Sequence, residues 1–236
     1  MEKPHIALFI LCLTACADSA QHTFSLPESL VGMSASPQLA CRYEKQVLGE
    51  NKAQPTNWYF WRQQKRTETR DELSNQGEIW ESINVGDFYY TRLFYNERVA
   101  LEWARGDLMA SGSTPSIKQI SSIVDPDMLG KELTLKGKAE SNGTAIEFYR
   151  GTVNSIATEV DWLPILQLPA RLVKQLPEGR VTLTLSICDK ASQFPVKPIT
   201  KAELDGFRRL DYTDLGDMED DPMVHHIEQL LGGHHH

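Results

Sequence analysis

The chain has 236 residues, of which 41% are hydrophobic, and a formal net charge of −8. This length and composition suit one folded domain with a short extension. The sequence, with its net negative charge, shows no basic face of the kind that contacts a phosphate backbone, so we expect no nucleic acid as a partner.

The N-terminus has the order of parts found in a secretion signal. Lys3 precedes a short apolar run from Ile6 to Leu13. This run is much shorter than the about 20 residues needed to span a bilayer, but it has the length of a signal-peptide core. The run ends in Leu13-Thr14-Ala15-Cys16, which resembles the lipobox of bacterial lipoproteins. The alternative is an ordinary secretory signal with a chance cysteine.

The lipobox resemblance implies that residues 1–15 are removed and that Cys16 carries the lipid. Three acyl chains would hold the protein on a membrane without a transmembrane helix. In that family an aspartate after the cysteine retains the protein at the inner membrane, and Ala17 stands at this position. We therefore expect a bacterial envelope protein anchored to the outer membrane and facing the periplasm.

Two cysteines remain after Cys12 leaves with the signal and Cys16 is lipidated. Cys41 and Cys188 would then sit in an oxidising compartment, where pairing is the default. A disulfide closing a loop of roughly 150 residues stabilises by about 4 to 5 kcal/mol on the chain-entropy model. The alternative is a cysteine-based metal or catalytic site, for which neither residue has another cysteine nearby.

After a Ser-, Ala-, Gln- and Pro-containing tether, the sequence becomes rich in strand patterns. Alternating apolar and aromatic residues predict strands over 57–66, 77–82, 87–95, 131–140, 144–150, 155–162, 171–175 and 180–187. Asn142-Gly143 predicts one hairpin turn between two such runs, and Pro177-Glu178-Gly179 predicts another. These turns indicate a mostly antiparallel sheet.

Three helices are expected among the strands. Ile117, Ile120, Ile123 and Val124 form one apolar face after Pro115. Thr200 and Glu203 have the spacing of a capping box, which predicts a helix over 200–209. Asp221, Pro222 and the final glycine pair predict a closing helix over 222–231 with an apolar side for docking.

We divide the chain into four regions: a signal peptide at 1–15, a lipidated cysteine and tether at 16–40, an antiparallel β domain at 41–200, and an acidic, His-rich helical extension at 201–236. The extension holds nine acidic and three basic residues, a net charge of −6. Its acidic stretch at 210–221 does not have the spacing of an EF-hand loop, so we expect a solvated linker there. Weak calcium binding by its carboxylates is the alternative.

The body of the chain resembles periplasmic lipoprotein carriers of the LolA/LolB type. The shared features are a strand meander over 42–188, Trp58 and Trp61 before a basic stretch, and Leu168-Pro169 before a strand. The resemblance implies a mainly β (α+β) fold, a curved antiparallel sheet or half-barrel with a few short helices, whose hollow holds acyl chains. Residues 18–56 depart from the family, because they read as linker and irregular chain where the family has a helix.

A hollow for acyl chains needs apolar side chains on its concave face, and aromatic residues are the candidates. The alternative is that these aromatic side chains only fill the core. The candidates are Trp58, Phe60, Trp80, Phe88, Tyr90, Phe94, Trp103, Phe148 and Trp162.

The sequence offers no phosphate loop, dinucleotide fingerprint, nucleophile elbow or zinc-protease motif, so we predict no enzyme. Carboxylate pairs such as Glu78 with Glu81, or Asp125 with Asp127, are the remaining catalytic candidates. We predict a lipid-anchored protein that binds a hydrophobic ligand, such as an acyl chain, or an envelope protein partner through its curved sheet.

The alternative function is that of a metal-binding accessory protein. No resident cofactor is expected, but neutral imidazoles bind Zn, Cu or Ni. Two of the candidate ligands are adjacent on the closing helix, point in different directions and lack a histidine four residues away. Any metal would therefore depend mostly on the last three residues. The candidate ligands are His225, His226, His234, His235 and His236.

Overall fold

The computed structural model describes residues 26–27, 30, 35–49, 54–84, 87–110, 115–189 and 194–232. Cys16 and His234 to His236 lie outside these residues.

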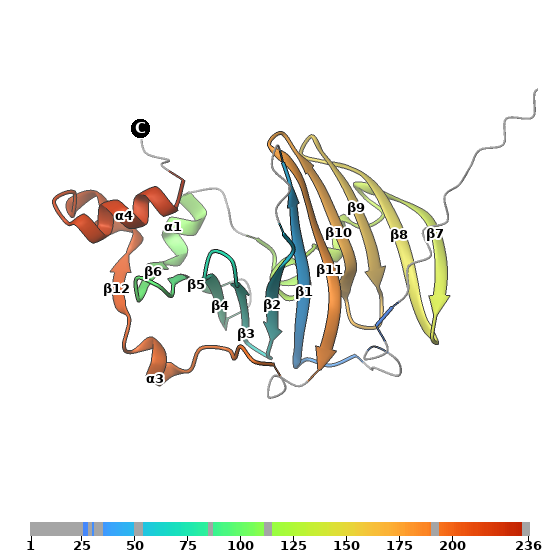
Figure 1. Ribbon diagram of the computed structural model, residues 1–236, viewed down its shortest axis with the longest axis horizontal. Helices are drawn as coiled ribbons and strands as arrows, with labels where there is room; N and C mark the ends of the chain where they lie inside the picture. Colours follow the sequence, from blue (N-terminus) through green and yellow to red (C-terminus); the bar gives the residue numbers. More distant parts are fainter. Residues whose placement is uncertain are drawn as a thin grey trace, which may run out of the picture.

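Twelve strands form one sheet (Figure 1): β1 (Leu39–Leu48), β2 (Thr56–Arg62), β3 (Arg66–Asp71), β4 (Gln76–Asn84), β5 (Asp87–Phe94), β6 (Val99–Trp103), β7 (Leu133–Ser141), β8 (Thr144–Val153), β9 (Ile156–Leu163), β10 (Leu168–Leu176), β11 (Gly179–Asp189) and β12 (Arg208–Asp211).

Short helical segments connect and flank the strands. Among the residues that the structure describes, no helix is long and apolar enough to cross a bilayer. The segments are α1 (Arg105–Ala110), α2 (Ile117–Ser122), η2 (Pro126–Met128), α3 (Lys201–Leu204), η4 (Tyr212–Asp217) and α4 (Pro222–Leu230).

Two meanders run outward from a joint between β1 and β11. The strand order is β12-β6-β5-β4-β3-β2-β1-β11-β10-β9-β8-β7. A segment carrying α1, α2 and η2 leads from β6, near one end of the sheet, to β7 at the other end. Every pairing between described strands is antiparallel except that of β12 with β6. The mainly β, antiparallel fold is therefore confirmed.

The joint between the meanders carries the predicted disulfide. Cys41 on β1 lies directly opposite Cys188 on β11, and their sulfur atoms are bonded across a sequence separation of 147 residues. Both side chains are buried. The disulfide is thus confirmed, and it ties the first strand of one meander to the last strand of the other.

Both predicted hairpin turns are present. Asn142 and Gly143 have φ values of 52° and 75°, as a two-residue turn between β7 and β8 requires. Gly179 starts β11 with φ 144°, and a Cβ there would lie 2.2 Å from the carbonyl oxygen of Leu48. Glycine at 179 therefore permits the close approach of β1 to this turn.

The sheet curls toward one side, which we call the inner face. Arg62 on β2 reaches the carbonyl oxygen of Leu166, in the turn between β9 and β10. Three strand spacings separate β2 from β10, which is about 14 Å in a flat sheet and beyond the reach of one arginine. Tyr43 on β1 likewise donates to the carbonyl oxygen of Pro169 on β10. Both contacts require the sheet to curve. We call the side of the sheet opposite the inner face the outer face.

Three of the expected boundaries were wrong. Residues 39–48 were expected to be irregular, but they form β1, in which Leu39, Cys41 and Tyr43 alternate toward the core. The single strand expected at 57–66 is two strands, because the chain turns between Arg62 and Arg66. The helix expected at 200–209 keeps its capping box but ends at residue 204, since the next residues form β12 beside β6.

Candidate functional site

Strand register places seven of the candidate aromatic residues on the inner face of β2, β4, β5 and β6. Opposed residues in an antiparallel pair share a face. One row across the sheet runs Arg62, Thr67, Trp80, Tyr90 and Trp103. The other residues of the set alternate onto the same face: Trp58, Phe60, Phe88 and Phe94.

The chain itself covers much of this aromatic surface. Phe94 and Trp103 are buried in a cluster with Leu108 of α1 and with Val224 and Ile227 of α4. Trp103 also stacks on Tyr212, with ring centroids 5.1 Å apart. The C-terminal extension therefore fills one end of the inner face, beside β6 and β12 (Figure 1).

The remaining candidates differ in exposure. Phe60 is buried in the cluster around the disulfide, and Phe148 packs against that cluster. Trp162 is buried in another cluster, with Val124 from the segment after α2. The half-buried candidates are Trp58, Trp80 and Tyr90, and Phe88 is buried but lines a cavity.

That cavity, which we call the α2 groove, lies between α2 and the inner face of β2 to β5. It holds about 230 Å³. Its apolar walls come from Trp80 and Phe88 on the sheet and from Ile117 and Ile120 on the helix. Ile117 is 50% exposed at the rim. Polar side chains including Gln63, Gln64 and Lys65 also line it. The groove is therefore open to solvent and has both apolar and polar walls.

A second space, the η2 cavity, lies along a different side of the same helical segment. It holds about 400 Å³ and is lined by Ile123, Val124 and Met128 together with Leu172 on β10. Charged residues including Lys131 also line it. Gln119 of α2 lines this space, whereas Ile117, Ile120 and Ser121 line the α2 groove, so α2 borders both spaces.

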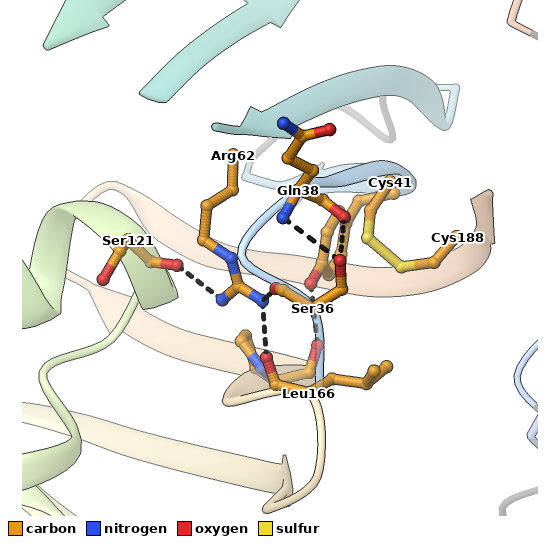
Figure 2. The surroundings of a disulfide bond; sticks show 9 residues. Ser36, Gln38, Cys41, Arg62, Ser121, Leu166 and Cys188 are labelled. Atoms are coloured by element: carbon orange, nitrogen blue, oxygen red, sulfur yellow. Dashed lines mark hydrogen bonds between the residues drawn. A yellow bond between two sulfur atoms is a disulfide. The ribbon is translucent and has the colours of Figure 1, made fainter. Parts of the chain in front are cut away.

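Arg62 holds α2 in that position (Figure 2). Its guanidinium donates to the carbonyl oxygen of Ser121 on α2 at 2.9 Å, and to those of Ser36 and Leu166 at 3.0 Å each. The Nε atom is buried without a hydrogen-bond partner. Burial lowers the pKa of Arg62, while the nearby Tyr43 acts in the opposite direction. One side chain of the sheet thus fixes three separate backbone segments.

The sequence did not single out Arg62, Ser121 or Leu166 as site residues. Arg62 ends an aromatic strand, which is an ordinary place for a solvated arginine. Its acceptors are backbone carbonyls that lie 26, 59 and 104 residues away in the chain. Backbone acceptors have no side-chain signature, so only the curvature of the sheet reveals this arrangement.

The carboxylate pairs considered for catalysis are separated or already engaged. Glu78 lies on the inner face opposite Thr69, whereas Glu81 lies on the outer face and pairs with Arg66. Asp125 accepts a hydrogen bond from the backbone N–H of Asp127, and Asp127 pairs with Lys118 at 2.8 Å.

The closing helix forms as predicted, with Asp221 as its N-cap and Val224 and Ile227 fully buried. His226 lies 3.4 Å from a carboxylate oxygen of Glu97, and His225 lies 3.0 Å from the side-chain nitrogen of Gln229. Over the described part of the chain, no three His, Cys, Asp or Glu side chains gather as a metal site. His234 to His236 lie outside that part, so metal binding stays a prediction.

The acidic stretch before the helix is folded rather than a solvated linker, because Leu210 and Leu215 are buried in the cluster beneath α4. Asp211 caps η4 and Asp221 pairs with Arg208. These carboxylates therefore complete local structure within the extension.

Neither a family model nor a curated protein matches the chain. Solved structures of several proteins resemble it at low identity, among them the following three. PNGF-II is 12% identical, with a TM-score of 0.45 over 78% of this chain and 33% of that one. The MucA/MucB complex of Pseudomonas aeruginosa is 11% identical, with a TM-score of 0.38 over 71% of this chain and 54% of that one. A DUF1329 family protein from Desulfovibrio piger is 10% identical, with a TM-score of 0.37 over 67% of this chain and 88% of that one.

The chain spans less than two thirds of the first two of these proteins. Likeness at this level assigns neither a family nor a function.

Proposed function

We propose that this chain is an envelope protein that binds an acyl chain on the inner face of its sheet, beneath α2. The observation that carries the proposal is the attachment of α2 through Arg62, beside an apolar groove. The proposed activity is binding, without chemical conversion of the ligand.

The helix that would move is short and lightly packed. α2 has six residues, too few for an isolated helix to be stable, so its position depends on tertiary contacts. Only Ile120 and Ser122 of α2 are buried. The hydrogen bond from Arg62 to Ser121 links this helix to the sheet, whereas Lys118 pairs with Asp127 of η2, in the same connecting segment. A ligand that displaces α2 must therefore break the Arg62 bond and move Ile120.

The space beneath α2 suits a slender apolar ligand. The α2 groove and the η2 cavity hold about 230 and 400 Å³. Ligand pockets commonly measure about 300 to 1,000 Å³, a range that the η2 cavity reaches alone and that the α2 groove does not. We propose that a ligand displaces α2, which borders both spaces, and so enlarges the α2 groove. Each methylene buried there would contribute about 0.8 kcal/mol.

We also propose that the protein is held at the outer membrane through Cys16 and faces the periplasm. The lipobox sequence supports this location. Mass spectrometry of the lipid-extracted protein tests it, because a Cys16→Ser variant should lack the acyl mass. Acylation that persists in this variant would remove the anchor from the proposal.

Binding is tested with a dansyl-labelled undecanoic acid, whose fluorescence rises in an apolar site. Ile117→Asp places a charge at the groove rim without touching the core, and should weaken binding roughly tenfold by removing apolar contact. Ile165→Asp is the matched control, because Ile165 is 45% exposed and lines neither space. Equal affinity of the two variants would contradict binding in the α2 groove.

A further inference from the structure

The outer face carries a second, basic pocket that the acyl-binding proposal does not use. It holds about 300 Å³ between β3, the end of β5, the segment before α3, and the chain that follows α3. We call it the Arg70–Arg98 pocket. Its lining includes Arg70, Tyr95, Arg98, Lys197, Glu203 and Phe207.

Aromatic rings and neutral oxygens fix both guanidinium groups. The Arg70 guanidinium carbon lies 3.7 Å from the ring centroid of Tyr95, and one Nη donates to the side-chain oxygen of Asn75 at 2.7 Å. Arg98 lies over Phe207 at 5.6 Å and donates to the carbonyl oxygen of Gly206 at 3.1 Å. Each guanidinium has five N–H donors, so most remain for a ligand.

Gly206 contributes space to this arrangement. A Cβ at this position would lie 2.6 Å from an Nη atom of Arg98. Glycine therefore lets the guanidinium lie against the backbone after α3, where it borders the pocket.

The pocket is positive although the chain is acidic. None of the ion pairs between described residues includes Arg70 or Arg98. Glu203 is the one carboxylate in the lining. It accepts hydrogen bonds from the N–H and the hydroxyl of Thr200 at 2.8 and 2.7 Å, and these bonds lower its pKa. Its charge is therefore engaged at the cap of α3.

We propose that the Arg70–Arg98 pocket binds a phosphomonoester group. Arg70 and Arg98 bring two guanidinium groups to the lining, and Glu203, its one carboxylate, is engaged by Thr200. A phosphomonoester carries about −1.5 to −2 at neutral pH, which two guanidinium groups balance. The planar fork of arginine matches phosphate oxygens in paired hydrogen bonds. The pocket lies on the face opposite the α2 groove, so its ligand is independent of the acyl chain.

The experiment measures binding of glycerol 3-phosphate by calorimetry at low, constant ionic strength, with glycerol as the control ligand. The full chain with Cys16→Ser is used. We expect saturable binding at one site, weakened about tenfold or more by Arg70→Gln or by Arg98→Gln, because each removes charge-assisted hydrogen bonds. Arg180→Gln is the matched control, since Arg180 is exposed and contacts Gln175.

A second arm separates a membrane source from a soluble one. Vesicles of phosphatidylcholine with and without phosphatidic acid are incubated with the same proteins. Arginine-dependent binding only to phosphatidic acid vesicles identifies a lipid headgroup, and binding of glycerol 3-phosphate without vesicle binding identifies a soluble ligand. Near-ultraviolet circular dichroism checks folding, and Lys197→Gln replaces any variant that fails to fold. Absence of binding in both arms, or equal weakening by Arg180→Gln, would overturn the proposal.

Discussion

Arg62 on β2 donates a hydrogen bond to the backbone carbonyl of Ser121 on α2 at 2.9 Å. The same guanidinium bonds two further carbonyls, and the Nε atom is left without a partner in a buried place. Because the donor is charged, each of these bonds is stronger than a bond between neutral groups. The position of the helix beside the groove thus depends on one arginine side chain.

Arg62→Gln should release α2. The variant loses charge-assisted hydrogen bonds, so the free energy of unfolding should fall by about 1.5 to 3 kcal/mol. Hydrogen exchange at the backbone amides of 117–122 should become faster than in the parent. Arg92→Gln is the control, because Arg92 lies on the same face and bonds the side chain of Gln76. Equal exchange in both variants would show that Arg62 does not hold α2.

Removing the disulfide should weaken the joint between the two meanders. In the Cys41→Ala, Cys188→Ala double variant, no covalent bond joins two positions that are 147 residues apart in the sequence. On the chain-entropy model the free energy of unfolding should therefore fall by about 4 to 5 kcal/mol. Urea unfolding of the oxidised parent and the variant measures this difference. An unchanged midpoint would mean that the β1–β11 pairing needs no covalent support.

The C-terminal helix should contribute to the stability of the β6 end of the sheet. Ile227 is fully buried, so Ile227→Ala should lower the free energy of unfolding by about 2 to 5 kcal/mol. His225→Ala, on the exposed side of α4, should change it by less than about 0.5 kcal/mol. Thermal unfolding compares the two. Equal effects would contradict docking of α4 through its apolar side.

Glu68 should make stability depend on pH. Burial raises its pKa above the ordinary 4.5, although the N–H of Ile199 and the Arg66 guanidinium act in the opposite direction. Because the folded chain holds this proton more tightly, its contribution to stability falls as pH rises from about 4.5 through the raised pKa. Glu68→Gln should remove this decline in a pH series of urea unfolding. A parallel decline in the variant would assign the effect to other groups.

Local patterns predicted much of the fold. Asn142-Gly143 specifies its own turn, and Asp221-Pro222 specifies the start of α4, because both depend on nearby residues. β1 was missed although Leu39, Cys41 and Tyr43 alternate toward the core, since polar residues fill its second half. β12 has four residues and forms through its parallel pairing with β6, more than 100 residues earlier, which no local pattern reveals.

The candidate site was predicted in part. Register places Trp58, Trp80 and Tyr90, three of the candidates for a concave face, on the inner face. The sequence could not show which of the aromatic side chains α1 and α4 would cover, because that depends on tertiary packing. The contacts of Arg62 depend on curvature in the same way.

Photo-crosslinking tests the central claim most directly. The Cys16→Ser chain is irradiated with a palmitate that carries a diazirine on its acyl chain, and labelled peptides are identified by mass spectrometry. Binding beneath α2 predicts label on the peptides containing Trp80, Phe88 and Ile117, which line the groove, with unlabelled palmitate competing for the site. Label confined to other peptides, or label that unlabelled palmitate does not reduce, would contradict the account.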